Sequence, residues 1–469
     1  MKKIKIIYIT ICSALILTTV SCEKVLDVTL VGQNEKQDAL KSEADLIALL
    51  NSGYASLASD NFYGGRLQVT NELLGDYIDG RELGGDESEV YRRNATFFNG
   101  QLNSMFEEGY RAINRVNNAL DNLDLASTNK SSIEGQAKFI RAIAHFELVK
   151  LYAQPYGFSQ DNSHLGIPLR LESKPSGSVR ATVKEVYAQI IKDLTEAETL
   201  LPEVSASGEF AKANKLSAKA FLAKVYFQTN NFAKAYDYAN QVIISNKFIM
   251  DTDYSKRFSL GTAAGYASKE VVFGLINERN IAAGTRFNTL KSFKSDLSLP
   301  TLRIDAAFYT SVKNNANDVR KGVWYDDTKY SDKVVSKKFN IERVDLPLVY
   351  LTELKLIRAE SASETNTNLA VAIADINDIM TRAYGGISRN IPAGASAQLI
   401  KNTARQERKF ELVGEGNRVQ ELKRQGAKGE SITIRNAPWN CPGLVLPFPN
   451  GEVANSPGFV QNPIGGTCN

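Results

Sequence analysis

The side chains of this sequence that could carry chemistry favour binding over catalysis. The chain has only two histidines: His145 falls in a periodic helical segment, where packing is the expected role, and His164 has no acidic or cysteine partner that the sequence can locate. The motifs of serine hydrolases, zinc proteases, P-loop NTPases and dinucleotide-binding enzymes do not occur. The 52 acidic residues leave a carboxylate pair for glycoside hydrolysis open, although so many carboxylates bring some pair together by chance. We therefore expect no enzyme activity, with a surface glycoside hydrolase as the alternative.

Aromatic residues in polar surroundings are the best candidates for ligand contact. Trp324 and Tyr325 are flanked by arginine, lysine and aspartate residues. An aromatic face beside hydrogen-bonding groups suits stacking on a sugar ring, and it would also suit a peptide. A second candidate set lies earlier in the chain, at Tyr91, Arg92 and Phe98. For each of these five residues, a role in packing is the alternative to ligand contact.

The cysteines and acidic runs predict no metal site and no cofactor. No C-x-x-C pattern or cysteine–histidine cluster occurs, which argues against zinc. Asp251, Asp253 and Ser255 have the spacing that begins a calcium loop, but the glycine and closing glutamate of such a loop are missing. Cys441 and Cys468 both lie in the C-terminal segment. Outside the cytoplasm they can form a disulfide that fixes the tail, and the sequence leaves open whether they do.

The N-terminal segment has the pattern of a lipoprotein signal. Three lysines lie within the first five residues, and residues 6–20 are apolar but too short to cross a bilayer as an ordinary helix. Residues 18–22 read Thr-Thr-Val-Ser-Cys, which resembles a lipobox. We expect removal of residues 1–21 and lipidation of Cys22, whose acyl chains would anchor the protein at roughly 0.8 kcal/mol per buried CH₂ group. A plain secretory signal with an incidental cysteine is the alternative.

The charge balance gives no reason to expect a nucleic acid as partner. The formal net charge is +4, and three of the positive charges belong to the signal segment. No acidic residue precedes Glu23, so the chain without residues 1–21 is nearly neutral. Binding to a polyanionic backbone usually requires a strongly basic surface.

The hydrophobic pattern predicts that a mainly α-helical scaffold holds these candidate residues. Capping-box patterns at Ser131 and Thr182 precede apolar residues spaced three or four apart. Two shorter helices, at about 216–228 and 231–244, carry small and aromatic residues where a tetratricopeptide unit has them. A similar pair is expected near 350–361 and 369–382. Stacked helix pairs of this kind form a scaffold, and the insertions between them carry the function.

Two loop-rich insertions interrupt the predicted helices. Residues 55–104 and 250–345 are rich in Gly, Asn, Asp, Tyr and Arg, with short β-like runs such as 270–276. Loops of this length inside a domain are usually functional, so we expect the ligand there. We predict one domain over residues 22–469. In this division, residues 23–45 form a tether and the start of the first helix, 46–345 form the scaffold with both insertions, and 346–469 form a C-terminal helical block with a loop-rich tail.

Four separated segments, in order along the chain, resemble the SusD/RagB family. Residues 141–169 resemble that family's RAxxYFxLVxxYG helix followed by xVPL, with His145 in place of an aromatic residue. The capped helix and the tetratricopeptide-like pair at 182–244 form the second segment. Residues 347–360 resemble the P-x-x-Y-A-E-x-x-L-I-x-A-E-A helix, which is the most specific of the matches. Residues 407–424, the fourth, resemble the E-R-x-x-E-L and E-G-x-R-x-x-D-L-x-R patterns.

The fourth segment departs from the family pattern in two places and has a physical role of its own. Glu421 replaces an aspartate, and Val413 and Gly414 stand where an aromatic residue is common. Acidic and basic residues alternate at helical spacing along this segment, so that ion pairs can join it to the preceding helix pair. Because buried charges need partners, we interpret these residues as structural rather than catalytic. The chain then closes with residues 446–462, as the chains of that family do.

The resemblance implies a surface-exposed lipoprotein of an outer membrane that captures a nutrient. It implies a SusC-like TonB-dependent porin as partner, with the helical side toward the barrel, and hand-over of the ligand without bond cleavage. A glycan is the expected ligand and a peptide is the alternative. A protein-interaction scaffold that binds no small ligand remains the rival from another functional class.

Overall fold

The structure is a computed structural model that describes residues 40–173, 179–203, 210–258, 268–276, 292–296, 298–315, 317–341, 344–464 and 468. The expected signal segment, Cys22 and the tether up to residue 39 lie outside the described residues. From Glu43 onward the chain forms one compact unit. The predicted division within residues 46–469 is therefore compared below element by element.

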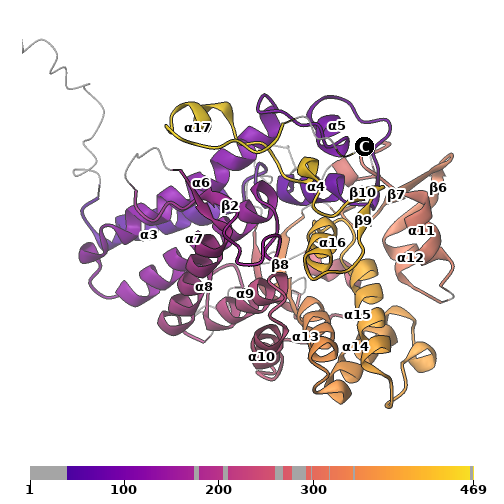
Figure 1. Cartoon of the computed structure of the whole chain (residues 1–469). Helices are drawn as coiled ribbons and strands as arrows, with labels where there is room; N and C mark the ends of the chain where they lie inside the picture. The colour runs from indigo at the N-terminus through magenta and orange to yellow at the C-terminus, as the bar shows by residue number, and fades with distance from the viewer. Residues whose placement is uncertain are drawn as a thin grey trace, which may run out of the picture. The chain divides into compact units, whose positions relative to one another are not determined.

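The fold is mainly α-helical (Figure 1), which confirms the predicted fold class. The long helices in chain order are α3 (Glu43–Leu57), α6 (Gly100–Leu120), α7 (Lys130–Tyr152), α8 (Val183–Leu200), α9 (Lys215–Gln228), α10 (Phe232–Ile243), α13 (Leu351–Thr365), α14 (Leu369–Ala383), α15 (Ala397–Glu411) and α16 (Arg418–Ala427). Shorter helices are α4 (Arg66–Leu74), α5 (Gly85–Tyr91), α11 (Ala306–Lys313), α12 (Arg320–Val323) and α17 (Asn450–Ala454).

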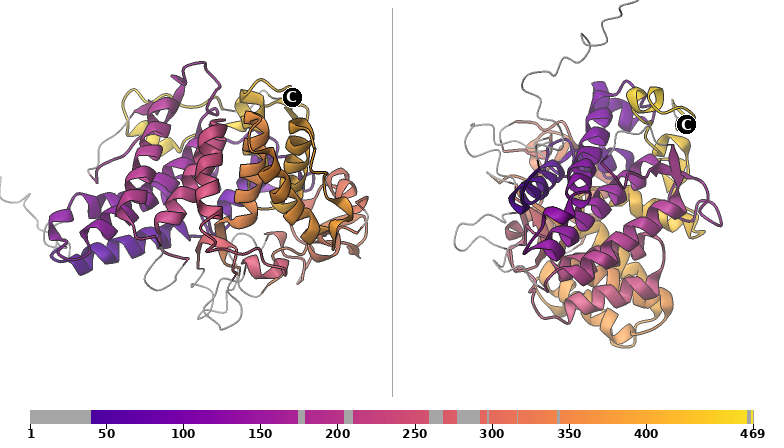
Figure 2. Two further views of the ribbon diagram at one scale, coloured as in Figure 1. Left: turned by 90° about the horizontal axis from the view of Figure 1, so that it is seen from below. Right: turned by 90° about the vertical axis from the view of Figure 1, so that its left-hand side faces the viewer.

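The helices pack in sequence order, and one contact crosses the second insertion. Helix α6 packs on α3 and α7, α7 on α8, α8 on α9, and α9 on α10. Helix α10 then packs on α13, which begins only after the second insertion. Helix α13 in turn contacts α14 and α15. Figure 2 shows these helices side by side in its left-hand view. The helix pairs that are scattered along the sequence are therefore neighbours in space.

The tetratricopeptide-like pairs have the packing that their small and aromatic residues predict. The bounds of α9 and α10 differ by at most one residue from the predicted helices, and α14 differs by one residue at its end. Ala223 and Ala235 are fully buried. The rings of Tyr226 and Tyr238 stack across the pair with centroids 5.7 Å apart. Small side chains thus let the two helices approach closely, and the tyrosines cover the interface.

One predicted helix start is confirmed and the other is wrong. Thr182 and Glu185 form the complete capping box of α8. Helix α7 instead begins after Asn129 rather than at Ser131. The carboxylate of Glu43 accepts hydrogen bonds from the backbone N–H groups of residues 127, 128 and 129 and from the side chain of Asn129. The Glu43 carboxylate, which is distant in the sequence, therefore fixes the turn that leads into the first helical residue, Lys130.

Short strands join the two insertions. Strands β1 (Ile78–Asp79), β5 (Arg303–Ile304), β7 (Lys333–Ser336) and β6 (Tyr325–Tyr330) form an antiparallel sheet in that order. The pairing of Ile78 with Ile304 places a part of the first insertion beside a part of the second. Strand β4 (Val271–Leu275), which lies in a run predicted to be β-like, pairs with β8 (Leu346–Tyr350). Two-residue strands β9 (Thr433–Ile434) and β10 (Ala437–Pro438), and β2 (Leu165–Pro168) with β3 (Arg180–Thr182), form two further pairs.

The first insertion is more helical than predicted. Helices α4 and α5 both lie within residues 55–104, which the sequence led us to expect as loop. Helix α4 buries Leu67, Val69, Leu73 and Leu74, so its apolar residues pack into the core despite the polar residues around them. The glycines and asparagines of this segment therefore mark turns between short helices rather than one long loop.

The C-terminal tail is fixed to the helices at several points. Cys441 and Cys468 form a disulfide with Cα atoms 5.7 Å apart, which answers what the sequence left open. The side-chain amide of Asn462 donates to the carbonyls of Tyr152 and Leu446 at 2.8 Å each. Phe448 is fully buried. The tail thus carries α17, which lines a hollow together with α6.

Candidate ligand-binding site

A hollow of about 1070 Å³ lies between α6 and α17. We name it the α6–α17 hollow, and it is large enough for several sugar rings or a short peptide. Its described lining consists of Phe97, Phe98, Asn103, Phe106, Glu107, Tyr110, Arg111, Ile113, Asn114, Asn117, Arg170, Glu172, Ser173, Pro449, Asn450, Gly451, Glu452, Asn455 and Ser456. The lining therefore combines aromatic rings, amides and charged groups from three separate parts of the chain.

An aromatic cluster forms the base of the α6–α17 hollow. The ring of Phe106 lies 4.6 Å from Tyr110, 5.1 Å from Tyr152 and 5.7 Å from Phe448, measured between centroids. The Tyr110 hydroxyl donates to the Pro168 carbonyl at 2.6 Å. Because these rings are buried and fixed to α6, α7 and the tail, the base is rigid before any ligand arrives.

Two phenylalanines stand at the rim, just before α6 begins. Asn99 caps α6 by accepting from the Leu102 N–H at 3.1 Å, and its amide donates to Glu89 at 3.0 Å. These bonds fix the turn that carries Phe97 and Phe98, whose ring centroids lie 4.3 Å apart. The Phe98 side chain is 78% exposed, the largest exposure among the described large apolar residues. An exposed ring on a fixed turn is suited to stacking on a ligand.

An arginine and a glutamate connect the two sides of the α6–α17 hollow. Arg170 Nη2 donates to both carboxylate oxygens of Glu452, at 2.5 and 2.7 Å. The Arg170 guanidinium also lies over the Tyr110 ring, 4.5 Å from its centroid. Glu452 belongs to α17, so this ion pair links the short helix to the segment that follows β2 and, through the Tyr110 ring, to α6.

Buried polar groups hold the backbone beside Arg170 in place. The Asn117 amide donates to the carbonyls of Arg170 and Glu172 at 3.2 and 3.1 Å. Asn117 Oδ1 accepts from Arg141 at 3.1 Å, and Arg141 makes two hydrogen bonds of 2.8 Å to Asp193. Arg141 belongs to the first of the segments that resemble a known family. The family-like segment on α7 is thus connected to the lining of the hollow through the side-chain amide of Asn117.

The prediction that Trp324 and Tyr325 offer an exposed aromatic face is corrected by the structure. Each of these side chains is only 2% exposed, and neither lines the α6–α17 hollow. The Trp324 ring packs against Tyr254, with centroids 4.8 Å apart, and the Lys338 ammonium lies 4.3 Å from the Trp324 centroid. Arg320 is buried beside them because it pairs with Asp318, whereas Lys321, Asp326 and Asp327 are partly exposed. Both aromatic residues therefore belong to the core.

The structure separates the second candidate set. Phe98 lines the α6–α17 hollow, whereas Tyr91 and Arg92 do not. The Tyr91 ring packs against the backbone of Gly80 and under the Arg435 guanidinium, which lies 4.0 Å from its centroid. Arg92 is exposed at the end of α5. Of the five aromatic and basic candidates, only Phe98 contributes to this hollow.

The described lining also contains residues that the sequence reasoning did not single out. Arg170 directly follows the family-like segment 141–169, and Asn450, Glu452 and Asn455 lie within the closing segment 446–462. No residue of the described lining comes from 250–345, whereas Phe97, Phe98 and Asn103 belong to the insertion at 55–104. No pattern in the sequence indicates that these three parts of the chain meet.

Comparison with known proteins identifies the family. A family model described as "Starch-binding associating with outer membrane" matches residues 32–227, and the model of the SusD family matches residues 308–464. A SusD-like protein, P2, of Formosa agariphila is 27% identical, over 98% of this chain and 99% of its own length. This chain belongs to the SusD/RagB family.

Solved structures of SusD-like proteins share the fold. A putative sugar binding protein from Bacteroides vulgatus is 26% identical, with a TM-score of 0.79 and coverage of 91% of this chain and 99% of the other. A SusD superfamily protein from Bacteroides thetaiotaomicron superposes with a TM-score of 0.77 at 20% identity, covering 90% of this chain and all of the other. The resemblance found in the sequence is thereby confirmed at the level of family and fold.

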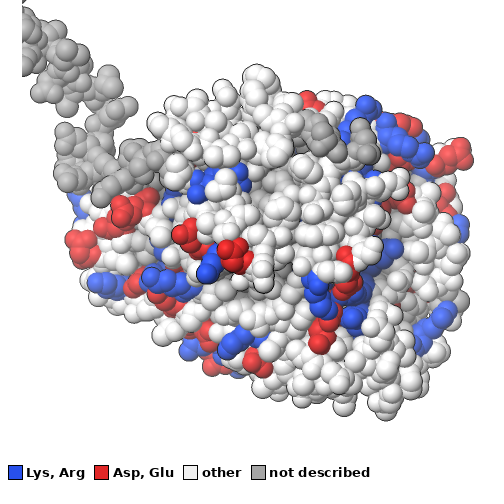
Figure 3. All heavy atoms as spheres, viewed as in Figure 1, with Lys and Arg blue, Asp and Glu red and all other residues white. Residues whose placement is uncertain are grey.

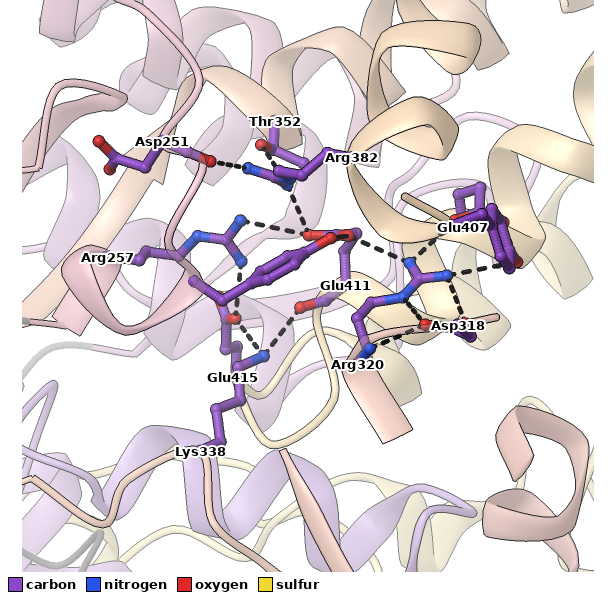
Figure 4. Close-up of polar contacts among 12 residues, drawn as sticks. Asp251, Arg257, Asp318, Arg320, Lys338, Thr352, Arg382, Glu407, Glu411 and Glu415 are labelled. Carbon is purple, nitrogen blue, oxygen red and sulfur yellow. Dashed lines mark hydrogen bonds and ion pairs between the residues drawn. The ribbon is translucent and has the colours of Figure 1, made fainter. Parts of the chain in front are cut away.

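The charged segment of the SusD/RagB pattern forms a buried ion cluster (Figure 4). Glu411 accepts from Arg382 at 3.0 Å, from Arg320 at 3.1 Å and from Arg257 at 3.2 Å. Burial alone would raise the pKa of Glu411, but attraction to these three guanidinium groups outweighs it and lowers the pKa to about 2. A carboxylate held ionised by three cations cannot donate a proton, so Glu411 is structural, as the sequence led us to expect.

One departure from the SusD/RagB pattern has a steric reason. Gly414, which stands where an aromatic residue is common, has φ of +79°. A Cβ at this position would lie 3.1 Å from the ring of Phe339, which is itself buried. A side chain at 414 would therefore meet both backbone strain and the Phe339 ring.

Burial or hydrogen bonding accounts for both histidines and for the calcium-like run. His145 is fully buried, and burial lowers its pKa to about 3, so that it stays neutral in the folded protein. His164 contacts Ser159 at 2.8 Å through Nδ1 and the Gln154 carbonyl at 3.1 Å through Nε2. The Asp251 carboxylate accepts from the side chain of Ser268 and from the Lys269 N–H. Within the described part of the chain, no group of three or more His, Cys, Asp or Glu residues could hold a metal ion.

The surface charges are intermixed on the face that Figure 3 presents. Basic and acidic side chains lie side by side over the helices, and mainly neutral side chains surround the position of α17. Such a face lacks the broad basic area that binds nucleic acids. Among the described residues we also find no helix with the length and apolar character needed to span a membrane.

Proposed function

We propose that this protein captures a glycan at the surface of an outer membrane and passes it to a SusC-like TonB-dependent porin without breaking a bond. The protein acts as a lipoprotein held through Cys22. Support comes from the family membership, from the lipobox-like residues 18–22, and from the B. vulgatus neighbour, which is described as a putative sugar binding protein.

The observation that carries the proposal is the lining of the α6–α17 hollow. A sugar ring has an apolar face that stacks on an aromatic ring and hydroxyl groups that need hydrogen-bonding partners. Phe98 offers the exposed ring. The side chains of Asn114, Asn450 and Asn455 are exposed around it, and each amide can both donate and accept.

A binding screen tests the capture role. The purified protein is titrated with pooled oligosaccharides and pooled peptides, with Phe98→Ala and Ile387→Ala alongside. Ile387 is a matched control, because it is 75% exposed and does not line the hollow. We expect saturable binding of an oligosaccharide whose affinity falls about fivefold in Phe98→Ala, since one aromatic stacking contact contributes about 1 kcal/mol. Ile387→Ala should bind as tightly as the unchanged protein.

The screen also separates the alternatives. Binding of peptides alone would keep the capture role and replace the ligand class. Absence of binding in both pools would contradict the capture role and favour the protein-interaction scaffold. Release of shorter sugars from a bound oligosaccharide, followed by reducing-end analysis, would contradict the non-catalytic role and favour the hydrolase.

Two measurements test the location and the partner. Cys22→Ala should move the protein from the membrane fraction to the soluble fraction, because the acyl chains that anchor it are lost. Affinity purification of the lipidated protein from its own cell envelope should recover a TonB-dependent porin, identified by mass spectrometry. A protein that stays in the membrane fraction after Cys22→Ala would contradict lipid anchoring at this residue.

A further inference from the structure

Both arginines that line the α6–α17 hollow are paired with carboxylates. Two arginines and three glutamates belong to the described lining, which contains no lysine. Arg170 is bonded to both oxygens of Glu452. Arg111 is bonded to Glu108, one turn away on α6, at 2.6 Å. In the described lining, each arginine therefore already has a carboxylate partner.

The Arg170 guanidinium is also held in orientation. It lies over the Tyr110 ring at 4.5 Å, and the Tyr110 hydroxyl is fixed to the Pro168 carbonyl. Asn117 binds the carbonyl of Arg170 itself. These contacts hold the guanidinium facing Glu452, with Nη2 as the bonded nitrogen, while the Arg170 side chain remains 32% exposed.

An acidic sugar and a neutral sugar meet this arrangement differently. A uronate or sulfate group is bound most strongly by a guanidinium that offers two parallel N–H donors. To use Arg170, such a group would have to displace Glu452 and leave that carboxylate without its partner beside the ligand's own negative charge. A neutral sugar needs only the aromatic ring and the amides, and it leaves the ion pair intact.

We propose that the Arg170–Glu452 ion pair makes the α6–α17 hollow selective for uncharged oligosaccharides, because it occupies the guanidinium that an acidic sugar requires. This inference rests on the proposed function and adds a specificity-determining pair to it. The selectivity arises because the Arg170 guanidinium is already paired and cannot bind an acidic group of the ligand, and no additional contact to the neutral ligand is needed.

The test uses one ligand in two charge states. A neutral oligosaccharide that binds the full-length protein in detergent is oxidised at its primary alcohols, which converts C6 hydroxymethyl groups to carboxylates and leaves the rings unchanged. Calorimetry compares both forms against the unchanged protein and three variants: Glu452→Gln, Glu107→Gln and Arg170→Gln. Circular dichroism and thermal unfolding verify that each variant is folded.

The proposal predicts a different result for each variant. The unchanged protein binds the oxidised form at least tenfold more weakly than the neutral form. Glu452→Gln releases the guanidinium and gains at least tenfold in affinity for the oxidised form. Glu107→Gln removes one negative charge from the same lining but leaves the ion pair intact, so it gains much less. Arg170→Gln, which has no guanidinium to offer, shows no gain.

Three outcomes overturn the inference. Equal affinity of the unchanged protein for both forms would show that no charge selection exists, while the capture role would stand. Equal gains in Glu452→Gln and Glu107→Gln would assign the effect to net charge rather than to the pair. Failure of every oligosaccharide to bind would contradict the proposed function and remove this inference with it.

Discussion

Arg257 donates to Glu411 at 3.2 Å, and neither side chain is more than 1% exposed. The same carboxylate binds Arg320 and Arg382, so one anion holds three guanidinium groups from separate parts of the chain. Arg257 precedes β4, Arg320 begins α12, and Arg382 lies at the end of α14. Glu411 therefore joins the second insertion to the C-terminal helices through a single side chain (Figure 4).

Replacement of Glu411 by glutamine should destabilise the fold strongly. Three buried cations would lose the charge that compensates them, a loss that typically costs about 3–5 kcal/mol. Urea unfolding measures this change in the free energy of unfolding. Asp327→Asn is the control: Asp327 pairs with the exposed Lys313, and such a pair contributes at most about 1 kcal/mol. Equal losses in both variants would contradict the central role of Glu411.

Because of the buried carboxyl group of Glu72, the free energy of unfolding should fall as the pH rises from about 4.5 to 8. Burial raises the pKa of Glu72 from 4.5 to about 8, although the Gly416 N–H donates to its carboxyl group at 2.9 Å. The folded state keeps this proton where the unfolded state has lost it. The contribution of this proton to the free energy of unfolding is therefore complete below pH 4.5 and lost as the pH rises through 8. Between these values the free energy of unfolding falls by up to about 1.4 kcal/mol per pH unit.

Glu72→Gln tests this pH dependence, because glutamine resembles the protonated carboxyl group and does not titrate. Unfolding free energies of both proteins are compared at pH 5, 6.5 and 8. The two proteins should differ little at pH 5, and the variant should be the more stable one at pH 8. A variant that is less stable at pH 8 would show that the folded protein needs the ionised carboxylate.

Trp324→Ala should destabilise the protein without weakening ligand binding. The ring is buried against Tyr254, and removal of such a side chain leaves a cavity that costs about 3–5 kcal/mol. Phe98→Ala should show the reverse, a weaker affinity with a free energy of unfolding within about 1 kcal/mol of the unchanged protein. If the folded Trp324→Ala protein loses affinity for the oligosaccharide, the second insertion contributes to the binding site and this prediction is contradicted.

Loss of the disulfide should lower stability and loosen the tail. Cys441 and Cys468 are 27 residues apart, and closure of a loop of this size usually contributes about 2–4 kcal/mol. Thermal unfolding with and without reductant measures the effect. The unchanged protein should respond to the reductant and Cys468→Ser should not. Insensitivity of both proteins would mean that the bond adds no stability.

The sequence predicts the fold far better than the binding site. The helices could be predicted because their signals are local: Thr182 and Glu185 are three residues apart and form the capping box of α8 with each other. The start of α7 was missed because its acceptor, Glu43, lies 84 residues before the first N–H group that it binds. Local patterns cannot show a partner that only folding brings near.

The burial of Trp324 was missed for the same reason. Trp324 stands among charged residues, which suggested a ring that contacts ligand. One of these charges, Arg320, is buried because it pairs with Glu407, which lies 87 residues further along the chain. Phe98 could be identified because its surroundings remain polar in the fold. Arg170 and Glu452 are 282 residues apart, and no pattern in the sequence indicates that they meet.

The tail that carries α17 is a covalent ring, closed between Cys441 and Cys468. Its anchoring groups, Phe448 and Asn462, lie on either side of the segment that faces the α6–α17 hollow. Within residues 450–456 the side chains of Glu452, Val453 and Ser456 are tied to the rest of the fold, and the other four positions are exposed. Under the proposed function, these four positions are where ligand preference can be changed while the rest of the chain is left unchanged.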